Sequence, residues 1–258
     1  MGWLRDFRRR RVLARSRVGE PLWAQAADCL PFLKGLPAED LARLRELALL
    51  FLHEKEMHGA GDFAIDDRIR LSIALQACLP ILNLGLDFYD GWLGVIVYPG
   101  EFRVRMSEVD EDGVVHEFED GLSGEAWPGG PVVLSWEDAS KNETGYNVVI
   151  HEFAHKIHMQ REDVDGHPIP HADMDAAEWR RALDEGYERL CRQVDAGRPT
   201  LVDDYAAEHP AEFFAVMSEM FFTDAAVLAR DWRELYYQLA HFYRQDPAGV
   251  IEPETARN

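Results

Sequence analysis

Apolar residues recur at helical spacing through much of the segment 21–90. Within 41–51 they lie three residues apart, which places them on one face of a helix. Pro37 and the two acids that follow Ala38 mark the start of this helix. Glycines at 59–61 interrupt the pattern, and Asp66 begins a second helix. We therefore expect a helical scaffold here, and none of its residues is a catalytic candidate.

From residue 91 the pattern changes to short β-branched runs and apolar–polar alternation, which indicate strands. Two alternating segments flank the turn-forming residues Asp110–Gly113, so they predict a hairpin. The glycine-rich stretch Gly121–Pro131 lacks the ending of a phosphate-binding loop, and we interpret it as an ordinary loop. The expected strands are Val95–Tyr98, Phe102–Val109, Val114–Phe118 and Pro131–Ser135.

The remainder alternates polar loops with helices. A polar loop, 137–144, leads into a mostly apolar helix over 147–158, and an amphipathic helix is expected over 173–194. These elements predict a single α+β domain, with a small mixed sheet packed on the 147–158 helix and largely helical N- and C-terminal regions. Its expected parts are a basic arm at 1–20, the helical scaffold at 21–90, the sheet and central helices at 91–247, and a tail at 248–258.

Composition limits the classes of partner. The net charge of −20 over 258 residues argues against direct nucleic-acid binding, because phosphates would be repelled. Three widely spaced cysteines form no disulfide framework and indicate a reducing compartment. The N-terminus lacks the apolar run of a secretory signal, and no stretch has the length of a bilayer span. We expect a soluble, cytoplasmic protein without a membrane partner.

A cluster of arginines, Arg8–Arg11, departs from the acidic average. Such a cluster either binds an anionic surface or a partner, or forms a solvated helix face that pairs with the acidic remainder. The second interpretation is the commoner one in proteins, and the sequence alone leaves both open.

The stretch Asn147–His158 holds the strongest chemical signal. His151, Glu152 and His155 follow the spacing H-E-x-x-H. In a helix, His155 lies within about 40° of His151, so both imidazoles leave one face and can bind one tetrahedral Zn²⁺. Glu152 lies roughly 60° from His155, where it can reach a water on the metal without ligating the metal. The alternative, two ordinary histidines beside a surface glutamate, fits the apolar setting poorly, since a buried unpaired carboxylate is costly.

A second histidine pair provides a contrast within the same chain. His53 and His58 flank a glutamate, but they are five residues apart and would point about 140° away from each other on a helix. We interpret this segment as a solvated helix end.

Two histidines leave a catalytic zinc site one protein ligand short. Pro210 can start a helix that places Glu212 in its first turn among phenylalanines. A carboxylate in such surroundings needs a counter-charge, which Zn²⁺ supplies. Glu219, seven residues on, lies on nearly the same face and is either the ligand itself or an acceptor for a ligand's N–H. The spacing favours Glu212 as the third zinc ligand. The alternative is that Glu212 is an ordinary core or surface glutamate whose charge is satisfied by other groups.

Three further histidines lie near the predicted metal site in sequence. His158 follows the second ligand by three residues, and His167 and His171 lie in the loop that we expect over 161–171. Any of the three could be a spare ligand, but lone loop histidines seldom bind metals. We therefore do not expect them to bind the zinc ion.

Several further segments are distinctive when taken together. They are Gly35–Leu41, Leu71–Leu82, Leu84–Trp92, Val97–Pro99, Gly130–Trp136, Asn147–Lys156, Pro210–Val216 and Phe242–Pro247. These segments resemble the Mlc titration factor A family of zinc peptidases. The resemblance covers most of the chain between about residues 20 and 247, and His158 stands where much of that family has Asp.

The active-site part is also similar to the catalytic domain of anthrax lethal factor. This resemblance implies a zincin-like fold and a gluzincin site with one Zn²⁺ per chain. It implies His151, His155 and Glu212 as ligands, Glu152 as general base, and a Tyr205 hydroxyl that points into the site.

Two functions follow from the resemblance. The first is a metallopeptidase, with aminopeptidase action as one form, that hydrolyses a peptide or protein substrate. The second is a regulatory protein that sequesters a Mlc-like transcriptional repressor and so controls the sugar phosphotransferase system; there the zinc site would be secondary. The two can coexist. A purely structural zinc site is disfavoured, because three ligands beside a glutamate base leave one metal position open.

Overall fold

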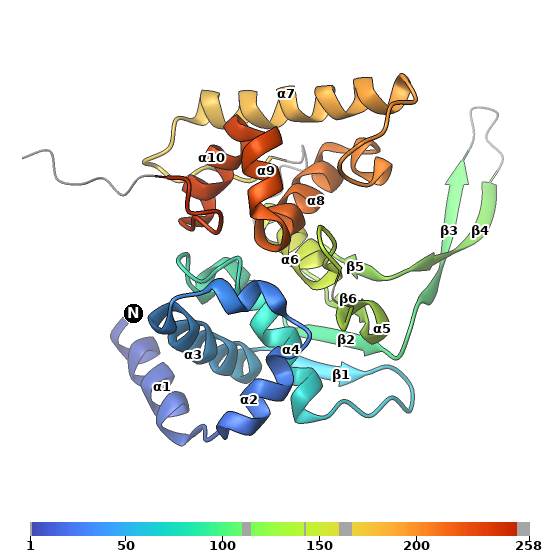
Figure 1. Ribbon diagram of the computed structural model, residues 1–258. Coiled ribbons are helices and arrows are strands. Elements are labelled where there is room, and N and C mark those ends of the chain that lie inside the picture. Colours follow the sequence, from blue (N-terminus) through green and yellow to red (C-terminus); the bar gives the residue numbers. More distant parts are fainter. Residues whose placement is uncertain (1, 110–114, 142, 160–166, 252–258) are drawn as a thin grey trace, which may run out of the picture.

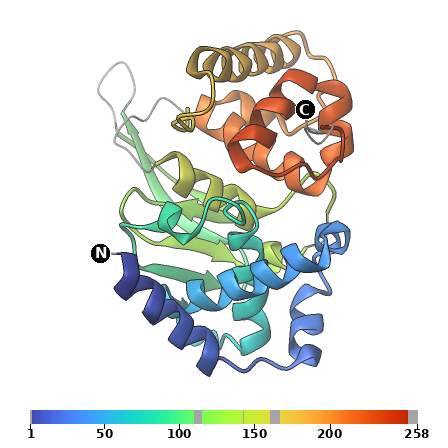
Figure 2. The same cartoon turned by 90° about the vertical axis from the view of Figure 1, so that its left-hand side faces the viewer.

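The computed structural model describes residues 2–109, 115–141, 143–159 and 167–251. A small sheet and helix α6 (Val148–His158) lie between two groups of helices (Figure 1, Figure 2). The first group is α1 (Gly2–Arg15), α2 (Glu20–Ala27), α3 (Ala38–Glu54) and α4 (Asp67–Cys78). The second is α7 (Ala176–Asp195), α8 (Pro210–Thr223), α9 (Ala225–Asp231) and α10 (Arg233–Tyr243). Short 3₁₀ turns are η1 (Pro31–Gly35), η2 (Leu86–Tyr89) and η3 (Asp204–Ala207).

The sheet contains four strands in the order β1-β2-β6-β5. Strands β1 (Glu56–Gly59), β2 (Gly94–Tyr98) and β6 (Val132–Ser135) are parallel, whereas β5 (Gly124–Ala126) runs antiparallel to β6 at the edge. Strand β6 is buried along its length, and both β5 and β6 contact α6. The edge strand therefore lies against the helix that carries the H-E-x-x-H residues.

A second sheet is the hairpin of β3 (Phe102–Val109) and β4 (Val115–Leu122), which extends away from the body (Figure 1). Its antiparallel register pairs Phe102 with Leu122 and confirms the hairpin expected from the alternating pattern. The predicted turn at Asp110–Gly113 lies outside the described residues.

The N-terminal scaffold supports α6 from one side. Asp66 caps α4 by accepting a hydrogen bond from the backbone N–H of Ile69 at 2.8 Å, as the sequence predicts. Aromatic rings from α3 and η2 meet the α6 ring of Phe153, with centroid distances of 5.6 Å to Phe51 and 5.1 Å to Tyr89. These edge-to-face contacts bury large apolar surfaces and hold the helix against the scaffold.

One cluster of buried apolar side chains extends from α2 to α10. It includes nearly all the apolar residues of α6, which confirms that this helix is surrounded on most sides. The mixed α+β architecture is confirmed. The single-domain organisation and its internal boundaries stay predictions.

Two local predictions were wrong and a third was right only in part. The segment His53–His58 begins with the exposed end of α3, as expected, but continues as strand β1, which forms because Met57 is buried and the backbone pairs with β2. The supposed loop 121–131 contains β5, and the supposed loop 137–144 contains the short helix α5 (Trp136–Ala139), capped by Ser135. Each element has only three or four residues, too few to show a hydrophobic period.

Candidate metal centre

Helix α6 begins where its sequence provides a cap. The Asn147 side chain accepts a hydrogen bond from the backbone N–H of Ile150 at 2.8 Å, and its amide donates to Gln76 of α4 at 2.7 Å. Its backbone N–H donates to the buried carboxylate of Glu219 on α8. The start of α6 is thus fixed to helices on both sides, so that the positions of its side chains are well determined.

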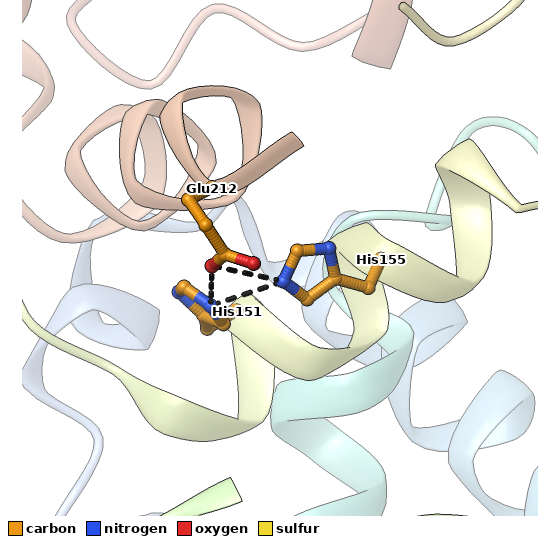
Figure 3. A group of neighbouring side chains, drawn as sticks. All are labelled: His151, His155 and Glu212. Carbon is orange, nitrogen blue, oxygen red and sulfur yellow. Dashed lines mark hydrogen bonds and ion pairs between the residues drawn. The ribbon is translucent and has the colours of Figure 1, made fainter. Parts of the chain in front are cut away.

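Figure 3 shows three side chains that point at one another from two helices. His151 and His155 leave α6 one turn apart with their Nε2 atoms 3.1 Å from each other. The Glu212 Oε2 atom, from the first turn of α8, lies 3.1 Å from His151 Nε2 and 3.3 Å from His155 Nε2. Within the described ranges, these three residues are the one group of His, Cys, Asp and Glu whose ligand atoms are close enough to share an ion. We call His151, His155 and Glu212 the ligand group.

The donor atoms fit a zinc ion. The His151 Nδ1 atom donates to Glu219 Oε1 at 2.7 Å, which leaves the Nε2 lone pair of a neutral imidazole facing His155 and Glu212. Lone pairs this close repel each other unless a cation lies between them. In a tetrahedral Zn²⁺ site with metal–ligand bonds of about 2.0–2.1 Å, neighbouring ligand atoms are separated by roughly 3.3 Å. The observed separations match that value.

The charges of the site also favour a bound cation. Burial lowers the pKa of His151, but hydrogen bonds to Glu212 and Glu219 outweigh it and raise that pKa well above its ordinary value. Burial raises the pKa of Glu212, but when the histidines carry a proton on Nε2 their hydrogen bonds to this carboxylate reverse the shift and lower it. A proton or a metal ion is therefore strongly favoured between these side chains.

Glu152 lies next to the ligand group, and strand β5 approaches it closely. Its side chain is buried, and burial raises its pKa to about 8. The edge strand packs directly on it, since a Cβ added at Gly124 would lie 2.7 Å from the Glu152 Cγ atom and still nearer to Oε1. Gly124 is not among the residues that the sequence predicted for the site, although a glycine within a strand often marks such a close approach.

Tyr205 lies in η3, where Asp203 accepts a hydrogen bond from its backbone N–H at 2.9 Å. Its ring centre is 6.5 Å from that of His151. Burial of the hydroxyl and the nearby charge of Glu212 raise the pKa of Tyr205. The residue is 46% exposed and lines the cavities at this centre, and its role in the site stays a prediction.

The other candidates take supporting or separate positions. Glu219 accepts from His151 and is not in the ligand group. His158 is buried, with its ring centre 6.1 Å from that of His155, but it is not in the ligand group either. His167 contacts Asp184, and His171 contacts the Phe242 carbonyl oxygen, so both bond to groups outside the site.

Two cavities meet at this centre. One of about 780 Å³ is lined by Tyr146, Val216 and Asp203, among others, and one of about 400 Å³ by His158 and His209. Both are lined by Gly124, His151, Glu152 and Tyr205. The ligand group is therefore accessible, with space on either side of Glu152.

A histidine pair on a buried helix, a glutamate from a second helix and an adjoining edge strand together define a metallopeptidase type of centre. The chain belongs to the glucose-regulated metallo-peptidase M90 family, whose sequence model matches residues 4–244. This family membership implies a bound metal, typically zinc, and confirms the resemblance seen in the sequence.

Curated relatives cover nearly the whole chain. Mlc titration factor A of Cronobacter sakazakii is 37% identical over 232 residues, which is 88% of this chain and 87% of the relative. The proteins of that name from Salmonella typhi and Salmonella typhimurium are 38% identical over 236 residues, or 89% of this chain and 88% of each relative.

Proposed function

We propose that this chain is a zinc-dependent peptidase of the gluzincin type. His151, His155 and Glu212 would hold the ion, and Glu152 would act as the general base. The observation that carries the proposal is the convergence of three ligand atoms, 3.1–3.3 Å apart, beside a buried glutamate. When bound, zinc lowers the pKa of a water toward about 7 and polarises the scissile carbonyl.

The protein's own groups supply the remaining steps. Glu152 accepts a proton from the attacking water and delivers it to the leaving nitrogen. The Tyr205 hydroxyl donates a hydrogen bond to the oxygen on which negative charge develops. Support for this role comes from the position of Tyr205, whose ring centre lies 6.5 Å from that of His151 and whose side chain lines both cavities beside Glu152.

Strand β5 provides a means of aligning the substrate. It is a sheet edge, paired on one side with β6, and it contacts the helix that carries Glu152. An extended peptide can pair with the free side of such a strand through main-chain hydrogen bonds. The cavities on the two sides of Glu152 offer space for residues before and after the scissile bond.

Aminopeptidase action is the finer form of the proposal. The larger cavity is lined by the acidic residues Glu143, Asp203 and Asp224, which would attract a free α-ammonium group. In that case, acetylation of a peptide's N-terminus should abolish its cleavage. An endopeptidase would cleave free and acetylated peptides alike, and this outcome would refute the finer form alone.

The deciding experiment compares the wild type with Glu152→Gln. Metal content should stay at one zinc per chain in both, because Glu152 is not in the ligand group, while cleavage of a peptide library should be lost in the variant. Glu178→Gln, an exposed change in α7, serves as the control and should cleave as the wild type does. Zinc binding by the wild type without any cleavage would overturn the peptidase proposal.

A regulatory role is the second candidate, and the name shared by the relatives favours it. We propose that this chain binds a Mlc-like repressor and thereby affects the sugar phosphotransferase system. Binding of such a repressor by Glu152→Gln would separate this role from hydrolysis. Failure of both wild type and variant to bind it would refute the regulatory role and leave the peptidase proposal intact.

A further inference from the structure

Helix α1 differs in composition from the rest of the chain. It holds six arginines and a single acid within Gly2–Arg15, although the net charge of the protein is −20. The same helix carries two exposed aromatic side chains. A concentration of positive charge on one helix of an acidic protein marks a surface for an anionic partner when that charge is not used internally.

One face of α1 attaches it to the body. Arg5 and Arg9 form ion pairs with Asp87, at 2.7 and 2.9 Å, and Val12 and Leu13 pack against the apolar core. Contacts with α3 complete this face. The internal pairing that the sequence suggested for the arginine cluster therefore applies to Arg9, on the inner face.

The opposite face has no counterpart in the described part of the chain. Trp3 is 75% exposed and Phe7 56% exposed, and their rings stack with centroids 6.2 Å apart. At about 100° per residue, Trp3, Phe7, Arg10 and Arg11 leave the helix within an arc of roughly 100°. Arg10 and Arg11 are exposed and make no ion pair with any described residue.

This combination suits a lipid surface better than a protein groove. Tryptophan and phenylalanine settle at the headgroup level of a bilayer, while guanidinium groups bind lipid phosphates through paired hydrogen bonds. Helix α1 lies at the outer edge of the molecule (Figure 1, Figure 2). Because salt screens charge beyond about 8 Å, the acidic remainder does little to repel a surface that touches α1.

We propose that α1 docks this protein flat on an anionic lipid bilayer, with Trp3 and Phe7 among the headgroups and Arg10 and Arg11 on the phosphates. Docking requires no membrane span, and no helix in the described residues is long and apolar enough to form one. The proposal departs from the expectation, drawn from the sequence alone, that no membrane partner exists. It is independent of the metal centre.

Sedimentation of the full chain with vesicles tests the proposal. The protein should bind vesicles that contain phosphatidylserine and should bind pure phosphatidylcholine vesicles weakly. Removing one arginine from an anionic surface weakens binding about fivefold, so the double variant Arg10→Glu/Arg11→Glu should bind at least about 25-fold more weakly. Trp3→Ala/Phe7→Ala should lose about tenfold or more, through the aromatic area that is no longer buried.

Matched controls separate local docking from net charge. Arg192→Glu/Arg198→Glu changes the net charge by the same amount, at exposed positions in α7 and just after it, and should bind as the wild type does. Zinc content should be equal in all variants. Equal sedimentation of the two double charge variants would overturn the proposal. Binding to soluble polyglutamate without binding to vesicles would also overturn it, in favour of an acidic protein partner.

Discussion

Two segments of this chain combine histidines with glutamate and one lysine, and they differ in which side chains the fold buries. In His53–His58 both histidines are exposed, and the buried side chains are Lys55 and Met57. In His151–His158, by contrast, Glu152, His155 and Lys156 are all buried. The two segments meet at Trp92, whose ring centre lies 4.1 Å from Lys55 Nζ and 5.0 Å from Lys156 Nζ.

The difference indicates what two histidines require to form a candidate metal centre. The first pair is five residues apart and divided between a helix end and a strand, so its imidazoles do not converge. The second pair lies one turn apart on a single helix, and Glu212 and Glu219 from α8 reach it. Spacing within one helix, burial and carboxylates from a second helix are all needed.

The largest effect is expected from His155→Ala. This change removes one of three ligand atoms, so zinc content should fall well below one per chain and peptide hydrolysis should drop by at least about 10³-fold. His53→Ala is the matched change in the other segment and should keep both. Metal analysis and peptide cleavage measure the two effects. Full zinc occupancy in His155→Ala would contradict the ligand assignment.

A smaller effect is expected from Gly124→Ala. The added Cβ would lie 2.7 Å from Glu152 Cγ, so either the base or the edge strand must shift. A displacement of about 1 Å at a catalytic group costs on the order of 10²-fold in kcat, and zinc content should not change.

Gly94→Ala is the control for that change. It is also a strand glycine, but its nearest neighbour, the Glu56 carbonyl oxygen, would be 3.5 Å from the new Cβ. Kinetics of both variants beside their zinc content measure the difference. Equal kcat in the two variants would show that the approach of β5 to Glu152 does not matter for catalysis.

The sequence predicted the parts of this site that local rules control. The H-E-x-x-H spacing and the Pro210 helix start fixed where His151, His155 and Glu212 would point, and the structure brings their ligand atoms together. Between Glu212 and Glu219, spacing favoured Glu212, whose Oε2 atom lies within 3.3 Å of both Nε2 atoms, and its role as a ligand stays a prediction. Local rules could not predict the contact of Glu152 with Gly124, because it depends on how closely a three-residue strand approaches a helix.

The buried lysine of the second segment, Lys156, should make the stability of the protein depend on pH. Burial, together with the nearby charge of Lys55, lowers the pKa of Lys156 to about 8. Between pH about 8 and 10.5 the unfolded chain therefore binds more protons at this position than the folded one. The free energy of unfolding should accordingly rise with pH across that window, by roughly 3 kcal/mol from this group.

Lys156→Met should remove this rise, whereas Lys141→Met should keep it, since Lys141 is exposed. Urea unfolding at several pH values measures the slopes. The same slope in both variants would show that Lys156 is not the source. Lys156 also donates to the carbonyl oxygens of Trp127 and Gly130, so its replacement should lower stability at every pH while the slope disappears.

The smallest effect is expected from His58→Ala. Its ring lies 3.2 Å from a Glu56 carboxylate oxygen, but the two side chains are 69% and 78% exposed, and solvent-exposed pairs contribute little. The free energy of unfolding should change by less than about 0.5 kcal/mol, with zinc content and hydrolysis unaffected. Chemical denaturation and metal analysis of the same preparation measure this. Loss of zinc from His58→Ala would mean that exposed histidines outside the ligand group also hold the ion, and the contrast between the two segments would then be wrong.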